Sequence, residues 1–259
     1  EVAGTVEAVG DKVTKFQPGD RVVSLSSLGA YAQKVGADES TVLKLPKAMS
    51  AEDACALMCG YGTSHHALKQ RGQLQSGETL CVLGASGATG VAAVQIGKAM
   101  GAKVIAVAST DAKRDIAREA GADIVLGYDN LKDELKEATG GKGVDVAFDP
   151  VGGEAFDVLS RSMAWNGRLL VIGFASGTIP KLPTNLTLVK GYSLVGVFWG
   201  AFTQKEPAVY AGNIEELFAW YLDGKIKPVI EGVYPLADAG VVLQRVLSRG
   251  AAGKIILRP

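Results

Sequence analysis

Apolar residues follow a strand–helix–strand pattern over residues 79–108. Residues 79–83 are apolar from Leu80 onward, which predicts a short buried strand. Residues 88–100 then carry apolar side chains at helical spacing until Gly101 ends the repeat. Residues 104–108 are a second apolar run and predict another buried strand. This βαβ unit is the stretch around which the rest of the chain is organised.

Glycines occupy the turn between the first strand and the helix. Gly84, Gly87 and Gly90 are spaced three apart, which differs from the GxGxxG spacing of the commonest NAD sites. Glycines at a strand-to-helix turn leave room for a pyrophosphate, which the amide groups at the helix start then bind. The pattern predicts a dinucleotide site, and a tight turn that binds nothing is the alternative.

Strands and helices continue to alternate after this unit. Such alternation is typical of an α/β fold with a doubly wound parallel sheet and right-handed crossovers. The predicted helices are 111–120, 131–138 and 154–164, and the predicted strands are 124–126, 143–149, 168–174 and 192–197.

The N-terminal part shows short strand patterns separated by turns. The pattern predicts strands over 2–9, 21–25 and 31–35. Ser50 begins an N-cap box, which predicts a helix over 51–59.

Gly60 and Gly62 are expected to end that helix, and a second helix is expected over 63–71. The C-terminal tail is expected to fold back onto the N-terminal part. Its predicted elements are helices over 207–223 and 237–248 and a strand over 251–257.

Composition and charge exclude several classes of partner. The 259 residues include 27 acidic and 27 basic side chains, so the net charge of zero favours neither nucleic acid nor an anionic membrane. No apolar run reaches the ~18 residues of a membrane-spanning helix. Three cysteines and the lack of a signal peptide favour a reduced, cytoplasmic protein over a disulfide scaffold.

Several short strings stand in a definite order along the whole chain. They are Glu1-Val-Ala-Gly-Thr-Val, Gly19-Asp-Arg-Val-Val, Gly77-Glu-Thr, Gly84-Ala-Ser-Gly-Ala-Thr-Gly, Gly143-Val-Asp-Val-Ala-Phe-Asp-Pro-Val-Gly-Gly, Gly167-Arg-Leu-Leu-Val-Ile-Gly and Gly253-Lys-Ile-Ile-Leu. With them the sequence resembles the zinc-free quinone oxidoreductase branch of the medium-chain dehydrogenase/reductase superfamily.

The resemblance implies a GroES-like catalytic domain split around a Rossmann domain. It places a partial GroES-like domain at 1–58, a Rossmann NADP-binding domain at 59–200 and a C-terminal return at 201–259. The chain begins at Glu1, inside a strand pattern and without Met. About sixty residues of the catalytic domain, a figure from family length, are therefore expected to precede it. The substrate-cleft Asn and Tyr of this branch would lie on that segment.

The resemblance also implies which groups bind the phosphates of the cofactor. Tyr128 follows the third strand, where the family often has a Tyr near the adenosine phosphate; an ordinary edge aromatic is the alternative. The pyrophosphate would be bound by the main-chain amides of Ser86, Gly87, Ala88, Thr89 and Gly90.

The second strand of the βαβ unit has no acidic residue at its end. An Asp or Glu there would hold the ribose 2′-hydroxyl of NAD and repel a 2′-phosphate. Ser109, Thr110, Lys113 and Arg114 supply donors and positive charge instead, although Asp111 lies close by. The segment predicts NADPH as the cofactor, and a solvated helix start is the alternative.

Residues at the nicotinamide end come from separate parts of the chain. Thr63 matches a family Thr near the nicotinamide, and a helix N-cap is its alternative role. Val151, Gly173 and Phe174 follow two consecutive strands, and ligands of open parallel sheets lie at the carboxyl ends of strands. We expect Val151 and Phe174 to border the nicotinamide, and an ordinary core position is the alternative for each.

Phe198 and Trp199 follow the last predicted strand of the sheet. They are expected to line the substrate side of the cleft, with Phe198 also bordering the cofactor. Ordinary core positions are the alternative for both.

No metal site is expected. Cys55 and Cys59 are one helical turn apart, and Cys55 falls near a ligand position of the zinc-dependent relatives. The adjacent His65 and His66 would point about 100° apart on a helix and chelate poorly. Catalytic zinc would also need further ligands.

Tyr221 and Lys225 match the YxxxK pair of short-chain dehydrogenases. The upstream Ser of that family is replaced by Ala208, and Gly224 is typical of a helix stop that would turn Lys225 away. We interpret the match as a coincidence.

These features predict hydride transfer from NADPH to a small quinone or enone without zinc. The alternatives are a 2-enoyl thioester reductase and a non-catalytic NADPH-binding protein. Residues 192–197 form an apolar strand at the sheet edge, which predicts a homodimer.

Overall fold

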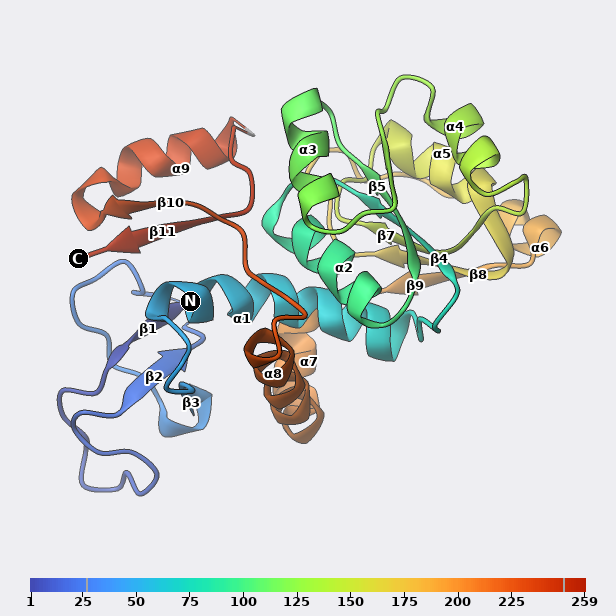
Figure 1. Cartoon of the computed structure of the whole chain (residues 1–259). Helices are drawn as coiled ribbons and strands as arrows, with labels where there is room; N and C mark the ends of the chain where they lie inside the picture. The colour runs from blue at the N-terminus through green and yellow to red at the C-terminus, as the bar shows by residue number, and fades with distance from the viewer. Residues whose placement is uncertain (27, 249) are drawn as a thin grey trace.

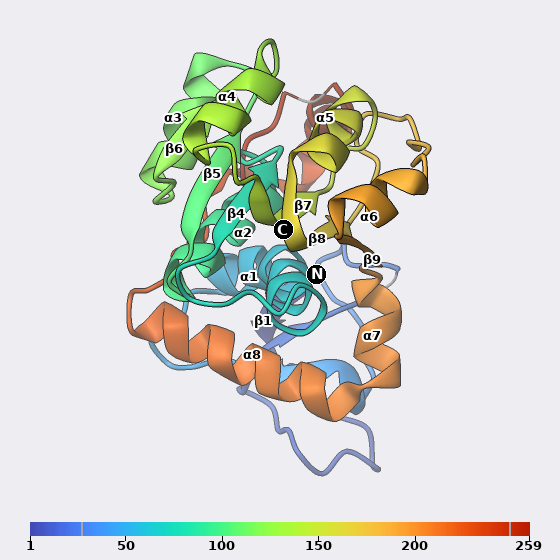
Figure 2. The ribbon, with the colours of Figure 1, turned by 90° about the vertical axis from the view of Figure 1, so that its right-hand side faces the viewer.

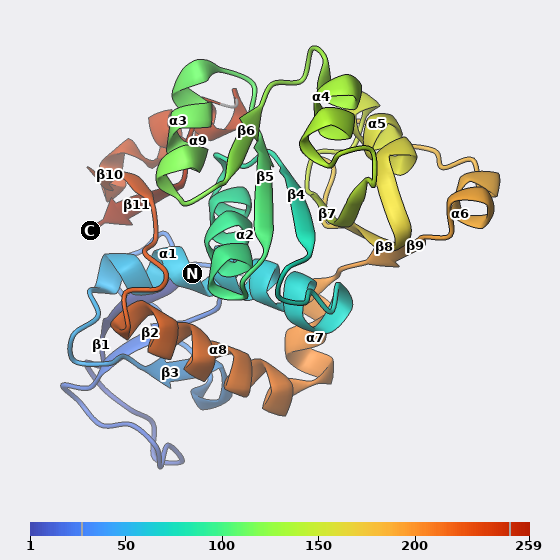
Figure 3. The ribbon, with the colours of Figure 1, turned by 45° about the vertical axis from the view of Figure 1, so that its right-hand side comes forward.

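A parallel sheet of six strands forms the centre of the protein. The structure is a computed structural model and describes residues 1–26, 28–248 and 250–259. The strand order β6-β5-β4-β7-β8-β9, with every pair parallel, confirms the predicted doubly wound sheet (Figures 1 and 3). Its strands are β4 (Thr79–Leu83), β5 (Lys103–Val107), β6 (Ile124–Leu126), β7 (Val144–Asp149), β8 (Met163–Val171) and β9 (Ser193–Gly196).

Helices lie around this sheet and beside the N-terminal part. Figure 2 shows α7 and α8 next to α1. Within the described part of the chain, no helix is long and apolar enough to cross a bilayer. The helices are α1 (Ala51–His66), α2 (Ala88–Ala99), α3 (Asp111–Glu119), α4 (Leu131–Ala138), α5 (Glu154–Ser162), α6 (Asn185–Lys190), α7 (Trp199–Lys205), α8 (Pro207–Leu222) and α9 (Ala239–Leu247).

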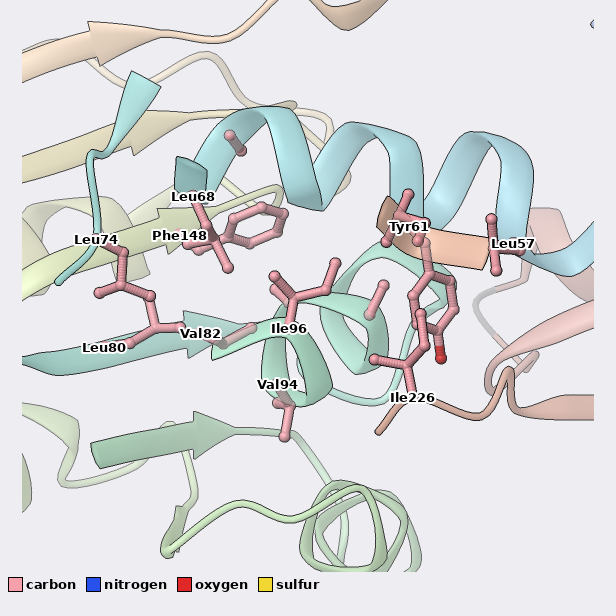
Figure 4. Packing of buried hydrophobic residues seen from close by; sticks show 14 of the residues in the cluster. Leu57, Tyr61, Leu68, Leu74, Leu80, Val82, Val94, Ile96, Phe148 and Ile226 are labelled. Carbon is pink, nitrogen blue, oxygen red and sulfur yellow. The ribbon is translucent and has the colours of Figure 1, made fainter. Parts of the chain in front are cut away.

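The sheet is buried on both faces. Alternate side chains of each strand point to opposite faces, and helices cover both. Leu80 and Val82 of β4 enter one hydrophobic cluster, together with side chains of α1 and α2 (Figure 4). Cys81 and Leu83 enter a second cluster, together with side chains of α4 and α5. Both faces are therefore covered by helices, as a parallel sheet requires.

Two small sheets lie at the N-terminal end of α1 (Figure 1). The strands β1 (Val2–Thr5), β2 (Arg21–Ser24) and β3 (Val42–Lys44) are antiparallel, whereas β10 (Ile230–Pro235) and β11 (Lys254–Arg258) are parallel. The C-terminal strand returns to the N-terminus, since the Lys254 ammonium lies 2.8 Å from both carboxylate oxygens of Glu1.

The predicted break in α1 is wrong. Gly60 and Gly62 lie within one continuous helix, which ends at His66 and continues as a π-helix over Ala67–Arg71. A Cβ at Gly62 would lie 2.7 Å from the Trp199 ring, so this glycine permits close packing instead of ending the helix. The predicted domain boundary after residue 58 falls inside α1.

Several other predicted bounds differ from the structure. Residues 31–35 form no strand, because Tyr31 is largely exposed and no neighbouring strand pairs with the segment. The predicted strand over 2–9 ends at Thr5, the last residue that pairs with β2. The strand β8 starts at Met163, inside the predicted helix 154–164, because Met163 pairs with Val144. The elements β3, α6, α7 and β10 were not predicted.

Candidate functional site

The turn between β4 and α2 requires glycine at defined positions. Gly84 has a φ of +58°, and a Cβ at Gly90 would lie only 2.1 Å from the Gly84 carbonyl oxygen. Gly87 precedes α2, and no described side chain caps the start of that helix. The first amide groups of α2 therefore have no side-chain acceptor among the described residues, which makes this helix start suitable for an anion.

Contacts from distant parts of the chain hold this turn in place. The Ser64 hydroxyl of α1 donates a hydrogen bond to the Thr89 carbonyl oxygen at 2.8 Å. The Gly253 amide, just before β11, donates to the Ser86 carbonyl oxygen at 2.8 Å. Neither contact is predictable from the local sequence, since the partners lie far apart along the chain.

Tyr128 also lies against the turn. Its hydroxyl accepts a hydrogen bond from the Gly84 amide at 3.1 Å, which leaves the phenolic proton for another acceptor. Burial raises the pKa of Tyr128, so the phenol stays protonated at neutral pH. The structure thus brings this predicted residue to the Gly-rich turn.

The end of β5 presents polar groups in the order predicted. Ser109 and Thr110 are exposed, and the Thr110 hydroxyl caps α3 by accepting a hydrogen bond from the Lys113 amide at 3.3 Å. The Arg114 guanidinium donates to the Ala108 carbonyl oxygen at 3.2 Å and pairs with the Asp111 carboxylate. Arg114 is thus engaged within its own segment.

Two loops follow β7 and β8 and contact each other. Val151 packs against the Gly-rich turn, because a Cβ at Gly84 would lie 3.1 Å from the Val151 Cγ2 atom. Gly173 donates its amide to the Asp149 carbonyl oxygen at 3.4 Å, and Phe174 next to it is 40% exposed. The alternative of an ordinary core position for Phe174 is therefore wrong.

The helix α1 joins the Gly-rich turn to the first turn of α7. Thr63 lies in the last turn of α1, so its alternative role as a helix N-cap is wrong. Trp199 lies over Gly62 and packs edge-on against Tyr210, with ring centroids 6.0 Å apart. Phe198 is 78% exposed, so it is not a core residue.

The two histidines have partners within the helical layer. His65 Nε2 lies 2.7 Å from a Glu216 carboxylate oxygen, and His66 stacks on the Phe202 ring. Burial lowers the pKa of both histidines. No group of three or more His, Cys, Asp or Glu residues is placed to hold a metal ion within residues 1–26, 28–248 and 250–259.

The YxxxK residues do not form a pair. The Tyr221 hydroxyl donates to the Asp53 carboxylate at 2.7 Å, whereas the Lys225 ammonium lies 3.4 Å from the Asp223 carboxylate. α8 ends before Lys225, as Gly224 indicated.

A groove of about 1220 Å³ runs between the small sheets and reaches the Gly-rich turn. The edge strands β1 and β11 border it, and Gly87 and Ala88 lie at its inner end. Lys254 also lines this groove, directly after the Gly253 that bonds the turn. Its ammonium is engaged by the Glu1 carboxylate at 2.8 Å, so its charge is paired within the protein.

Two family models match the chain. A zinc-binding dehydrogenase model matches residues 88–216, and a model of the alcohol dehydrogenase GroES-like domain matches residues 1–47. A protein described as a quinone oxidoreductase-like protein 2 homolog from Nematostella vectensis is 37% identical over 262 residues, which cover 99% of this chain and 72% of that protein. The human quinone oxidoreductase is 34% identical over 261 residues, which cover 99% of this chain and 78% of the relative.

Solved structures with the same fold include complexes with NADPH. A mycobacterial protein complexed with NADPH has a TM-score of 0.92 and 33% identity, with 99% of this chain and 81% of that chain covered. Quinone oxidoreductase of Escherichia coli, also complexed with NADPH, has a TM-score of 0.90 and 30% identity, with 99% and 80% covered. The CurK enoyl reductase has a TM-score of 0.88 and 25% identity, with 98% and 76% covered.

Proposed function

The chain belongs to the quinone oxidoreductase branch of the medium-chain dehydrogenase/reductase superfamily, and from that premise we propose that it transfers hydride from NADPH to a quinone or an α,β-unsaturated carbonyl without zinc. The observation that carries the proposal is that α2 begins without a side-chain cap among the described residues. It begins at the turn where Gly84 and Gly90 pack together. Gly90 lets α2 pack directly on the backbone of Gly84, and the uncapped amides at the start of this helix suit a pyrophosphate. NADPH, when bound, supplies the hydride.

The phosphates are assigned to two sites along the ends of β4 and β5. Amides of Ser86, Ala88, Thr89 and Gly90 bind the pyrophosphate, with the Tyr128 hydroxyl as a further donor. The predicted Gly87 amide instead donates to the Gly84 carbonyl oxygen at 3.0 Å within the turn. Ser109, Thr110 and Lys113 bind the 2′-phosphate of NADPH, since no carboxylate ends β5 to repel it. Two relatives of known structure are NADPH complexes, which supports this choice of cofactor.

The acceptor is assigned to the apolar side of the same edge. Thr63, Val151, Gly173 and Phe174 border the nicotinamide, while Phe198 and Trp199 line the acceptor side, so that a flat, conjugated molecule suits the cleft. Hydride transfer to a quinone or enone gives a phenolate or enolate that takes its proton from solvent. Such acceptors do not need the polarisation that zinc provides for a plain aldehyde.

Zinc independence is supported by the partners of the candidate ligands. His65 is held by Glu216 and His66 by its stack on Phe202, so neither side chain is available without repacking α1 against α7 and α8. Burial also raises the pKa of the Cys55 and Cys59 thiols, which disfavours the thiolate form that binds zinc.

Reduction of a 2-enoyl thioester is the second candidate, and the likeness to the CurK enoyl reductase favours it. A non-catalytic NADPH-binding role is the third. Steady-state assays with NADPH should compare 9,10-phenanthrenequinone, a crotonyl thioester and, in the reverse direction, ethanol oxidation. We expect the quinone to be reduced fastest. Faster reduction of the thioester selects the second candidate, and no turnover of any acceptor selects the third. Ethanol oxidation faster than quinone reduction contradicts all three.

A homodimer through β9 is part of the proposal. The strand lies at the edge of the sheet with Leu194 partly exposed, and Trp165 and Leu188 nearby are also exposed. An exposed apolar edge strand invites pairing with a second copy.

A further inference from the structure

A buried carboxylate stands at the end of β7 without a cationic partner. Asp149 is 1% exposed, and no ion pair joins it to a cation in the described part of the chain. Its Oδ1 atom accepts hydrogen bonds from the amides of Val151 and Gly152, both at 2.8 Å. Burial raises the pKa of this carboxyl, and the two amide bonds act against that effect.

The main chain of the same residue holds the neighbouring loop. The Asp149 carbonyl oxygen accepts the Ile172 amide at 2.9 Å, at the end of β8. Beyond this point the loops after β7 and β8 are joined by further backbone bonds. They run from the Ala175 amide to the Pro150 carbonyl at 3.0 Å, from the Ser176 amide to the Val151 carbonyl at 2.9 Å, and from the Gly153 amide to the Thr178 carbonyl at 3.2 Å. The Asp149 carboxylate therefore holds the first loop directly, and the second loop is tied to the first by backbone bonds.

The first of these loops needs such an anchor. Gly152 and Gly153 both have positive φ, at +67° and +62°, and two successive glycines have little conformational preference of their own. A Cβ at Gly152 would lie 2.9 Å from the Thr178 carbonyl oxygen and 3.2 Å from a Phe174 ring atom. The loop is thus packed between Phe174 on one side and the Gly-rich turn, through Val151, on the other.

We propose that Asp149 is a positioning residue: by accepting the Val151 and Gly152 amides it fixes both loops, and so sets how Val151 and Phe174 hold the nicotinamide. Asp149 acts through the loops and does not touch the cofactor. Its role is that of an acceptor, so Asp149→Asn, which keeps an oxygen at Oδ1, preserves it. The inference rests on the proposed function only in assigning the nicotinamide to these loops.

Cofactor-free protein tests the anchoring itself. Amide hydrogen exchange should rise in residues 151–153 and 173–178 of Asp149→Ala and stay at the wild-type level in Asp149→Asn. Asp145→Ala is the matched control, because the Asp145 carboxylate accepts the Thr79 amide at 2.8 Å from the other end of β7. In Asp145→Ala, amide hydrogen exchange should rise only around Thr79. Unchanged exchange of the two loops in Asp149→Ala would overturn the anchoring.

The effect on the nicotinamide is measured with NADPH. Asp149→Ala should keep its affinity for NADPH within about threefold, because the phosphates dominate binding, but should change the emission of the bound nicotinamide. Its kcat should fall about ten- to a hundredfold, as for a misplaced reactant, with a larger isotope effect from 4-deuterated NADPH. Asp149→Asn should restore the wild-type emission and kcat, and Asp145→Ala should leave the emission and kcat unchanged.

The outcomes separate the inference from the proposed function. Loss of activity in Asp149→Asn equal to that in Asp149→Ala, or unchanged emission in Asp149→Ala, overturns the positioning role. If the wild type reduces no acceptor, the proposed function fails, and exchange and emission still decide the role of Asp149. Should Asp149→Ala not fold, Gly152→Ala disturbs the same loop and should give the same loss of kcat with retained NADPH affinity. Wild-type kcat in that variant would count against the inference.

Discussion

The Ser64 hydroxyl of α1 donates a hydrogen bond to the Thr89 carbonyl oxygen of α2 over 2.8 Å. Gly60, one turn earlier on α1, lies against the same helix start, since a Cβ there would be 3.2 Å from the Ala88 carbonyl oxygen. Because Ser64 is fully buried, water does not compete for this hydrogen bond. The position of the candidate pyrophosphate site thus depends on α1.

Ser64→Ala should weaken both folding and cofactor binding. Loss of a buried hydrogen bond should lower the free energy of unfolding by about 1 kcal/mol, and the affinity for NADPH should fall a few-fold as α2 shifts. Ser160→Ala is the matched control, because the buried Ser160 hydroxyl donates to the Asp157 carbonyl oxygen at 2.8 Å on α5, away from the turn. Urea unfolding and NADPH fluorescence titration measure the two effects. Equal NADPH affinity in both variants would contradict the role of Ser64.

The sheet was predictable because its strands are apolar runs that need no information from elsewhere in the chain. Leu80 to Leu83 are fully buried, and their continuous apolar pattern indicates a strand covered on both faces. The glycines of α1 were misinterpreted for the opposite reason. A glycine such as Gly62 looks the same in the local sequence whether it ends a helix or makes room for Trp199. Only the tertiary contact with Trp199 distinguishes the two roles.

The candidate site was predictable only in part, for a related reason. Tyr128 and Val151 lie at the ends of predicted strands, where sheet topology gathers ligand-binding residues. Ser64, Asp149 and Gly253 act through hydrogen bonds within the protein, and for Ser64 and Gly253 the partner is distant in sequence. Nothing in their local pattern distinguishes them from ordinary helix, strand and turn residues.

Lys113→Ala tests the choice of cofactor. A charge-assisted hydrogen bond to the 2′-phosphate contributes roughly 1.5–3 kcal/mol, so the affinity for NADPH should fall about ten- to a hundredfold while that for NADH stays unchanged. Lys136→Ala removes the same charge from the last turn of α4 and should change neither affinity. Equal affinities of the wild type for NADPH and NADH would refute the assignment.

Folding stability should fall as the pH is lowered through the histidine range. Burial lowers the pKa of His65 and His66 in the folded protein, whereas the unfolded chain titrates near ~6.5. The unfolded state then binds more protons than the folded state as the pH falls. The free energy of unfolding therefore decreases below about pH 6.5, and the contribution of the histidines is complete above it. Urea midpoints between about pH 7.5 and about pH 5.5 measure the slope. His65→Gln should have a smaller slope, and an equal slope would exclude His65 as a source.

Leu194→Lys tests the proposed dimer. A charge on the edge strand β9 disfavours pairing with a second copy, so light scattering should find a dimer for the wild type and a monomer for the variant. Leu222→Lys, at the exposed end of α8, is the control and should remain a dimer. A wild-type monomer at micromolar concentration would contradict the prediction.

The most direct test of the central claim is the consumption of NADPH with 9,10-phenanthrenequinone by protein freed of metal with a chelator. The wild type should reduce the quinone equally well before and after metal removal. Gly90→Ala should lose this activity, because its Cβ would lie 2.1 Å from the Gly84 carbonyl oxygen, whereas Gly212→Ala, with open space around it on α8, should keep it. Turnover that is lost with the metal and restored by zinc, or that is equal in the two glycine variants, would contradict the account.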